Sequence, residues 1–424
     1  MLDIKFIREN PDAVKQALID RRSPVDIEVL LDMDRQRRDR LVAVEALKQE
    51  RNTVSKAIGL KKRSGEDTTE EQNRMRQVGE EIAAQDNEIR KLEEQLAEHL
   101  LMVPNMPSAD TPVGEDAGGN RFVRAWGEPA TFDFEPQLHT DLAQQLGLVD
   151  FARATKVAGA GFVVYTGQGA RLERALIQFM LDIHTREHGY TEVSPPFVCN
   201  VDAMTGTGQL PKMAEDMYAV PADSLYLIPT AEVPVTNLYR DEIMAGPLPV
   251  AHVAYTPCFR REAGAAGRDT RGLIRLHQFD KVELVRFVEP DAAAAELELL
   301  VGHAETILQR LGLPYRVIEL CTGDLSFAAA RCYDIELWAP GHKDWLEVSS
   351  CSHFGDFQAR RAGIRYRPEG GKPQFVHTLN GSGVALARLY VAILENGQQP
   401  DGSVKLPEAL VPYMGGMELL RPDP

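Results

Sequence analysis

The chain has 424 residues, of which 44% are hydrophobic and 26% are charged, and its formal net charge is −16. These values are typical of a folded globular protein with two or three domains. The acidic balance argues against a nonspecific nucleic-acid binder but allows a local basic patch. The five cysteines are scattered without a CxxC pair, so neither a disulfide framework nor a cysteine zinc site is expected. The start, MLDIKFIREN, has no signal pattern and no run is long enough for a membrane span, so we expect a cytoplasmic protein.

A short helical cap is expected up to about Pro24, and two long polar segments follow it. In roughly 26–60, and again in 68–103, apolar residues alternate at spacings of three and four, most clearly at Met75, Val78, Ile82, Ile89, Leu92, Leu96 and Val103. This heptad pattern is typical of a coiled coil. We expect a helix break at Gly59, Ser64, Gly65 and Asp67, and a capping box made by Thr68 and Glu71. The simplest structure is an antiparallel helical hairpin, an arm roughly 50 Å long.

The end of this arm is positively charged. Between Arg51 and Gly65 there is no acid and there are five basic residues, Arg51, Lys56, Lys61, Lys62 and Arg63. Such a tip suits nucleic-acid phosphates, but it equally suits a solubilising helix end or a coiled coil that only dimerises. Four further arginines, at 35, 37, 38 and 40, alternate with acids and are expected on a solvated face.

Residues 103–133 read as a linker, because proline and glycine recur there and stop helices and strands. We therefore expect an N-terminal domain, 1–104, and a second domain, 105–424, in which helices and strands mix, giving an α+β protein. Residues 139–146 predict a short helix and 169–189 a longer amphipathic helix. The stretch 190–198 predicts a strand interrupted by two prolines.

Two short stretches carry polar groups that suit a small substrate. TGTGQLPKM, residues 205–213, is a Gly-rich loop, although it is no Walker loop because no Ser or Thr follows its lysine. Residues 225–235 read as a strand ending in Thr230, Ala231 and Glu232, which suit an amine and a hydroxyl. Polar residues at a strand end are usually ordinary surface residues, so this signal is weak by itself.

The stretch 259–283, FRREAGAAGRDTRGLIRLHQFDKVE, predicts a hairpin with a polar loop between Ala263 and Gly272. Side chains alternate along a strand, so one face should carry Arg260, Glu262, Arg275, His277, Phe279, Lys281 and Glu283. The core face should carry Ile274, Leu276, Val282 and Leu284. Arginine binds phosphate, an aromatic ring stacks on a base, and a carboxylate holds an ammonium group. The alternative is a solvated hairpin with paired surface charges, but this clustering of roles favours a nucleotide site.

This hairpin resembles motif two of a class II aminoacyl-tRNA synthetase, and its amino-acid sequence resembles that of the bacterial seryl-tRNA synthetase family. The helix 169–189 and the proline-broken strand after it resemble motif one, and HTLNGSGVALARLYVAILE, residues 377–395, resembles motif three. In motif three we expect a Gly-rich turn, 380–383, that opens an apolar helix. The resemblance covers the whole chain, including the arm. It implies a catalytic domain built on an antiparallel sheet flanked by helices, and a homodimer formed through motif one. The motif-one residues alone fit a plain core helix and strand equally well.

The resemblance also implies roles in ATP binding. Arg260 would bind the substrate carboxylate and the α-phosphate, and Arg275 would bind the phosphates. Glu262 would bind the adenine or phosphate side of ATP. Phe279 would stack on adenine opposite Arg388. Glu347 and Ser350 resemble the pair that holds the magnesium ion of ATP, and their spacing of three requires the strand to end or bulge between them. The remaining candidates on the ATP side are Arg261, Val348 and Ser349, and the catalytic candidates are Arg260, Arg275 and Arg388.

The implied amino acid is L-serine. The triplet Thr230, Ala231 and Glu232 would line its pocket together with Ser382, and Glu283 would read its hydroxyl or amine. A buried acceptor for a hydroxyl discriminates strongly against alanine. The basic arm would embrace the long variable arm of tRNA(Ser) by shape, and tRNA(Sec) where that is present. The serine carboxylate would attack the α-phosphorus of ATP, and the terminal ribose hydroxyl of the tRNA would then take the seryl group.

Three positions depart from the family pattern. Arg261 stands where many members have serine, Gly161 replaces a usual arginine, and Ala387 stands where a glycine precedes the motif-three arginine. None of these removes a candidate catalytic residue. The alternatives are a catalytically impaired paralogue that binds RNA or regulates, a coiled-coil assembly protein, and a class II enzyme for another amino acid.

Overall fold

The computed structural model describes residues 1–263 and 272–422, which form two compact units, Met1–Pro104 and Asn105–Pro424. The loop predicted between Ala263 and Gly272 therefore lies, apart from its two end residues, outside the described residues. Long N-terminal helices and a large antiparallel sheet flanked by helices confirm the α+β prediction. In the described part of the chain, no helix is both long enough and apolar enough to cross a membrane.

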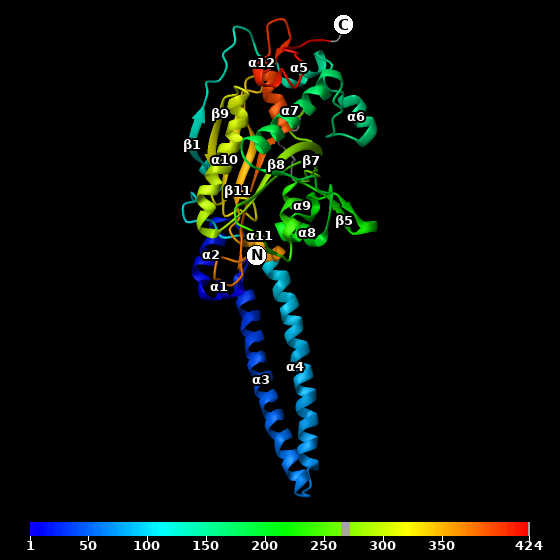
Figure 1. Ribbon diagram of the computed structural model, residues 1–424, viewed down its shortest axis with the longest axis vertical. Helices are drawn as coiled ribbons and strands as arrows, with labels where there is room; N and C mark the ends of the chain where they lie inside the picture. Colours follow the sequence, from blue (N-terminus) through cyan, green and yellow to red (C-terminus); the bar gives the residue numbers. More distant parts are fainter. Residues whose placement is uncertain (264–271, 423–424) are drawn as a thin grey trace. The chain divides into compact units, whose positions relative to one another are not determined.

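The N-terminal unit is a helical hairpin with a small helical base (Figure 1). Two short helices, α1 (Ile4–Glu9) and α2 (Pro11–Asp20), pack on the beginning of α3 (Ile27–Arg63). The long helices α3 and α4 (Thr69–Leu101) lie side by side, and their seam is a cluster of Val44, Val78, Ile82 and Ile89. Of the predicted heptad positions in α4, Val78, Ile82, Ile89 and Leu96 are buried, and Met75 and Leu92 are partly buried.

The turn between α3 and α4 differs from the prediction at two points. Gly59 lies inside α3, because a single glycine in an exposed helix costs only about 1 kcal/mol and does not by itself end it. The predicted capping box is wrong. The Thr68 hydroxyl accepts a hydrogen bond from Gln72 (2.6 Å), Glu71 forms an ion pair with Lys61, and the Asp67 carboxylate accepts from the Thr69 N–H (3.0 Å).

The second unit is organised on an eight-stranded sheet in the order β1-β9-β10-β11-β14-β8-β7-β2. Its strands are β1 (Arg121–Trp126), β2 (Thr191–Glu192), β7 (Val250–Phe259), β8 (Gln278–Val288), β9 (Tyr315–Glu319), β10 (Arg331–Ala339), β11 (Asp344–His353) and β14 (His377–Ala385). Neighbouring strands run antiparallel except for β2 beside β7. The predicted linker is therefore partly wrong, because Arg121–Trp126 forms an edge strand whose hydrogen-bonding partner, β9, lies almost 200 residues further along the chain.

Helices α7 (Gly167–Arg186), α10 (Ala293–Arg310) and α12 (Leu386–Gly397) pack on the sheet (Figure 1). Their apolar stripes join the inward-facing strand residues in one large core that includes Leu176, Leu300 and Leu389. The predicted amphipathic helix of motif one is thus present as α7. The other helices are α5 (His139–Gln145), α6 (Phe151–Ala158), α8 (Val201–Thr207), α9 (Glu232–Thr236) and α11 (Phe357–Ala362).

Several predicted elements near the site have different boundaries. The helix α8 includes the first residues of the predicted loop 205–213, and its C-cap, Gly208, has a left-handed φ of 97°. The predicted strand 225–235 is only β5 (Leu225–Leu227), and Thr230 to Glu232 lead into α9 instead of ending a strand. The predicted Gly-rich turn 380–383 lies within β14. The strand expected after α7 is split into β2 and β3 (Val198–Asn200) around the two prolines.

The remaining strands are short and lie outside the main sheet. One small sheet joins β3, β5 and β4 (Ala219–Val220), another joins β13 (Gln374–Phe375), β12 (Arg365–Tyr366) and β6 (Ile243–Met244), and a third joins β15 (Val404–Lys405) to β16 (Leu419–Leu420).

Candidate active site

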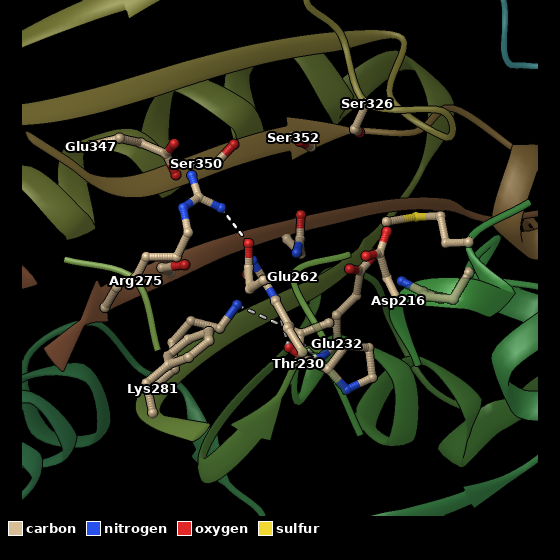
Figure 2. A pocket seen from close by; sticks show the side chains of 18 of the residues that line it. Asp216, Thr230, Glu232, Glu262, Arg275, Lys281, Ser326, Glu347, Ser350 and Ser352 are labelled. Atoms are coloured by element: carbon tan, nitrogen blue, oxygen red, sulfur yellow. Dashed lines mark hydrogen bonds and ion pairs between the residues drawn. The ribbon is translucent and has the colours of Figure 1, made fainter. Parts of the chain in front are cut away.

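A cavity of about 590 Å³ lies over β8, β11 and β14 in the second unit. Its lining includes Lys281, Ser350 and Ser382, one from each of these strands. In Figure 2, Glu347 and Ser350 lie on one side of the view, and Thr230, Glu232 and Lys281 lie on the other. Residues far apart in the sequence are therefore brought to one hollow.

One side of the cavity is built by the ends of the motif-two hairpin. The Arg260 guanidinium lies over the Phe279 ring at 5.2 Å, and its Nε donates to the carbonyl of Pro229 (3.2 Å). Arg275 forms an ion pair with Glu262, as Figure 2 shows. All four predicted side chains line the cavity, and together they offer two guanidinium groups and an aromatic face to a ligand.

The alternation predicted for the second arm holds only where the arm is a strand. Because β8 begins at Gln278, the four residues before it follow no strand pattern. Ile274 and Leu276 line the cavity, although they were predicted on the core face. His277 packs against Phe162 and its Nδ1 lies 3.1 Å from the Arg260 carbonyl oxygen, so it belongs to the base of the hairpin.

A β-bulge in β11 brings Glu347 and Ser350 to the same cavity. The pairing with β10 shifts between Ile335↔Ser349 and Glu336↔Glu347, so one extra residue, Val348, stands in β11. This extra residue restores both Glu347 and Ser350 to the cavity side, although a regular strand would place them on opposite faces. The predicted bulge is confirmed, and it presents a carboxylate and a hydroxyl as two hard oxygen donors.

Arg388 lies at the start of α12 and extends to the same side of the cavity. Its Nε donates to the Ile274 carbonyl (3.2 Å), and its Nη1 donates to the Glu347 carbonyl (2.6 Å) and lies 3.5 Å from the Glu347 carboxylate. These contacts supply the partners that a charge on a mostly apolar helix requires. The guanidinium therefore lies between the motif-two segment and the bulge of β11.

The opposite side of the cavity is a compact network of charges. The Lys281 ammonium donates to the Thr230 hydroxyl (3.0 Å) and pairs with Glu283 (2.5 Å). Asn380 donates to the other oxygen of Glu283 (2.7 Å), and Gln358 donates to Glu232 (2.6 Å). Burial, reinforced by the charge of Glu283, raises the pKa of Glu232 to about 7.

Four predicted site residues do not line the cavity. Ala231 is fully buried beneath Thr230 and Glu232, and Glu283 is buried behind Lys281 and Asn380. Arg261 is exposed, and its backbone N–H donates to the Asp216 carbonyl (2.9 Å). The Ser349 hydroxyl donates to the Ser382 carbonyl (2.6 Å) on the far side of the strand. Of these four, the buried residues Ala231, Glu283 and Ser349 affect the cavity only through the residues that they contact.

Several lining residues had no predicted role, namely Gln209, Asp216, Ser326, Ser352 and Asn380, and Lys281 was predicted on the correct face but without a role. A signal existed for Lys281, since it alternates with Phe279 on the predicted face. Asn380 was hidden because its segment was interpreted as a turn. Asp216 ends a single turn of 3-10 helix, Ala214–Asp216, and Ser326 lies in an irregular segment, so no periodic pattern could indicate the direction of either side chain.

The structure explains why glycine stands at position 161. Its φ is +81°, its carbonyl accepts from the His277 N–H (2.8 Å), and a Cβ there would lie 2.1 Å from the His277 ring. No larger side chain fits without moving the base of the hairpin. Ala387 lines the cavity beside Arg388.

Family models match most of the chain. A model described as the seryl-tRNA synthetase N-terminal domain matches residues 1–107, and one described as the tRNA synthetase class II core domain (G, H, P, S and T) matches 218–397. The serine–tRNA ligase of Desulforamulus reducens is 59% identical over 420 residues, covering 99% of both chains. The chain belongs to the serine–tRNA ligases. The family expected from motifs two and three is confirmed, and with it the class of enzyme, a class II aminoacyl-tRNA synthetase.

Other serine–tRNA ligases agree over the full length. The enzyme of Pelotomaculum thermopropionicum is 57% identical over 418 residues, covering 98% of this chain and 99% of that one. Among solved structures, the seryl-tRNA synthetase of Pyrococcus horikoshii, complexed with ATP, superposes with a TM-score of 0.96 at 38% identity and complete coverage of both chains. The family's fold thus extends through both units of this chain.

Proposed function

We propose that this enzyme uses ATP to convert L-serine into seryl-adenylate and then transfers the seryl group to tRNA(Ser). The carrying observation is the single cavity that holds Arg260, Arg275, Arg388 and Phe279 on one side and Thr230, Glu232 and Lys281 on the other. A volume of about 590 Å³ is within the range of sites for a nucleotide-sized ligand. ATP occupies the arginine side, and serine occupies the side of Thr230 and Glu232.

The reaction needs orientation and charge stabilisation more than a side-chain nucleophile. The serine carboxylate attacks the α-phosphorus in line, and negative charge grows on the phosphoryl oxygens as pyrophosphate leaves. Arg260 holds the carboxylate and the α-phosphate, Arg275 holds the phosphates, and Phe279 and Arg388 hold the adenine between them. Fixed guanidinium groups cost little reorganisation as the charge develops, so they stabilise the transition state more than the substrate.

Magnesium fits the oxygen donors that the bulge of β11 brings together. Glu347 and Ser350 supply a carboxylate and a hydroxyl, and magnesium in proteins is held by a few hard oxygen ligands together with substrate phosphates. When bound, it would offset phosphate charge. Arg388, which lies 3.5 Å from the Glu347 carboxylate, keeps that carboxylate oriented toward this position.

Serine is selected by its small size and by its hydroxyl and amine. Glu232 receives the ammonium group, and Thr230 and Ser382 border the space for the side chain. Glu283 acts from beneath, because it fixes Lys281 and Asn380 at the cavity wall. Alanine would leave a buried polar group without its partner, and the extra methyl group of threonine would need room.

The arm of the N-terminal unit is proposed to bind tRNA(Ser), and tRNA(Sec) where a cell makes it. Four of the five basic tip residues are exposed, and Lys61 pairs with Glu71. The arginines lower on the arm are occupied, since Arg37 pairs with Glu93 and Arg38 with Asp34. The free positive charge is therefore concentrated at the tip, which supports phosphate contacts by the tip more than by the shaft.

A cytoplasmic homodimer through motif one completes the proposal. The segment from α7 to β3 includes two neighbouring exposed apolar residues, Phe197 and Val198, as expected of a surface that meets a second copy. Sedimentation at micromolar concentration tests this assembly, and a monomer mass would contradict it. The impaired-paralogue alternative is less favoured, because Arg260, Glu262, Glu347 and Arg388 all meet in the cavity.

The test of the activity is ATP–pyrophosphate exchange with each of the 20 amino acids, followed by transfer of labelled serine to tRNA. Exchange should depend on serine and be far weaker with threonine and alanine. Exchange that is independent of serine, or equal with threonine, would refute the proposed function.

A further inference from the structure

The strand β14 carries a second bulge beside the one in β11. Its pairing with β8 shifts between Ser382↔Glu283 and Val384↔Val282, so Gly383 is the extra residue. Because of this bulge, Ser382 and Ala385 both line the cavity while Val384 is buried in the core. A regular strand would instead bring Val384 to the cavity and turn Ala385 away.

The two bulges lie where the ladder between β11 and β14 ends. The last backbone pair of these strands is Cys351↔Gly381. Directly beyond it, the Ser349 hydroxyl donates to the Ser382 carbonyl over 2.6 Å. A side chain thus continues the connection between the strands after the backbone ladder has stopped. Ser349 is only 1% exposed, so this bond is shielded from water.

The bulged residue itself is held from the helical side of the sheet. His184, fully buried on α7, lies with its Nε2 3.1 Å from the Gly383 carbonyl oxygen. A Cβ at Gly383 would lie 2.7 Å from that nitrogen, so the close approach requires glycine. A carbonyl only accepts, so His184 must carry its proton on Nε2, and its Nδ1 must accept from the Nδ1–H of His188, 3.0 Å away.

The supporting histidine is itself fixed. The His188 ring stacks on His303 at 4.0 Å, and His303 bonds with the Tyr190 hydroxyl over 3.0 Å. Burial lowers the pKa of His184 to about 4, so the ring is neutral at physiological pH and its tautomer is set by these two contacts. The donor to Gly383 is therefore prepared before any substrate binds.

We propose that Ser349 and His184 are positioning residues that lock the two bulges, and that Ser349 links the ATP side of the cavity to the serine side. The inference rests on the proposed function, because it assigns Ser382 to the serine and Glu347 with Ser350 to ATP. Ser349 touches both bulges, since it follows Val348 in one and bonds Ser382 in the other. His184 touches only the bulge of β14. The two residues should therefore have different kinetic signatures.

The test is pyrophosphate exchange by the full-length enzyme, with the KM for serine and for ATP measured separately. His184→Leu removes the donor and should raise the KM for serine about five- to tenfold, the effect of one lost buried hydrogen bond, while the KM for ATP stays within about twofold. Ser349→Ala should raise both KM values about fivefold. His184→Gln should restore the KM for serine to within about twofold of the intact enzyme, because its amide nitrogen can take the place of Nε2.

Thr185→Ala is the matched control. It removes a hydroxyl–carbonyl bond of 2.7 Å from the same helix, next to His184, without touching either bulge, so both KM values should stay unchanged. Thermal unfolding of each variant shows whether the fold persists. The inference would be overturned if His184→Leu raised both KM values equally, or if His184→Gln were as impaired as His184→Leu. It would also be overturned if His184→Leu and Ser349→Ala both left the KM for serine within twofold of the value for the intact enzyme. An intact enzyme without serine-dependent exchange would overturn the proposed function as well.

Discussion

Replacing Glu232 by glutamine should remove a pH dependence that burial builds into the serine side of the cavity. Glu232 is 7% exposed and accepts a hydrogen bond from Gln358 (2.6 Å). Burial is the main cause that raises its pKa from 4.5 to about 7, the charge of Glu283 adds to it, and the nearby Lys281 and Arg260 oppose it. Glutamine keeps the shape and an acceptor for Gln358 but cannot ionise.

The sign follows from the protons bound in each state. In the unfolded chain the carboxyl loses its proton near pH 4.5, whereas in the folded enzyme it keeps the proton up to about pH 7. The folded state therefore binds more protons between these values, and this group's contribution to stability falls as the pH rises through that window. The shift corresponds to about 3 kcal/mol, so the free energy of unfolding of Glu232→Gln relative to the intact enzyme should rise by up to that amount between pH 4.5 and pH 8.

The assay is urea unfolding of both proteins at pH 4.5, 6, 7 and 8. Asp202→Asn serves as the control, because Asp202 is an exposed carboxylate on the neighbouring helix α8. The difference in free energy of unfolding between this variant and the intact enzyme should not rise between pH 4.5 and pH 8. In exchange assays, the KM of the intact enzyme for serine should fall as the pH rises through 7, because only the ionised carboxylate pairs with the serine ammonium. The KM of Glu232→Gln should be higher and flat. A stability difference that is equal at pH 4.5 and pH 8 would refute the reasoning.

Three further predictions concern other parts of the chain. Arg388→Ala should lower serine-dependent exchange by about 10²- to 10³-fold with an unchanged circular dichroism spectrum, and near-normal exchange would mean that its contacts with Ile274 and Glu347 are only structural. Deleting residues from about 34 to 97 and joining the ends with a short linker should spare exchange but sharply reduce transfer of serine to tRNA. Neutralising the exposed basic residues of the tip should flatten the salt dependence of tRNA binding. If the deletion variant charged tRNA fully, the arm would be only a coiled coil. Gly161→Ala should destabilise the enzyme more than Gly159→Ala, measured as the midpoint of thermal unfolding, because both have positive φ but only the Cβ at Gly161 meets the His277 ring; equal losses would remove the role of that clash.

The sequence alone determined the features that depend on local periodicity and on residue type. The heptads of α3 and α4 specify their shared seam, because a helix repeats its faces every three to four residues whatever lies beyond it. The alternation of Phe279 and Lys281 specified the cavity side of β8 for the same reason. The motifs named the arginines and carboxylates of the site, and the spacing of Glu347 and Ser350 demanded an irregular strand before any pairing was visible.

Tertiary structure decided the features that depend on a partner distant in the sequence. Arg121–Trp126 is a strand because its backbone pairs with the edge of β9. No local pattern in a Pro- and Gly-rich segment predicts that pairing. Thr230 and Glu232 line the cavity from the N-terminal end of the short helix α9, because their backbone leads into α9 and does not continue the small sheet before it. The roles of Ser349 and His184 exist only where β11 and β14 diverge against α7, since a buried carbonyl beyond the end of a ladder must find its donor on whichever element packs there.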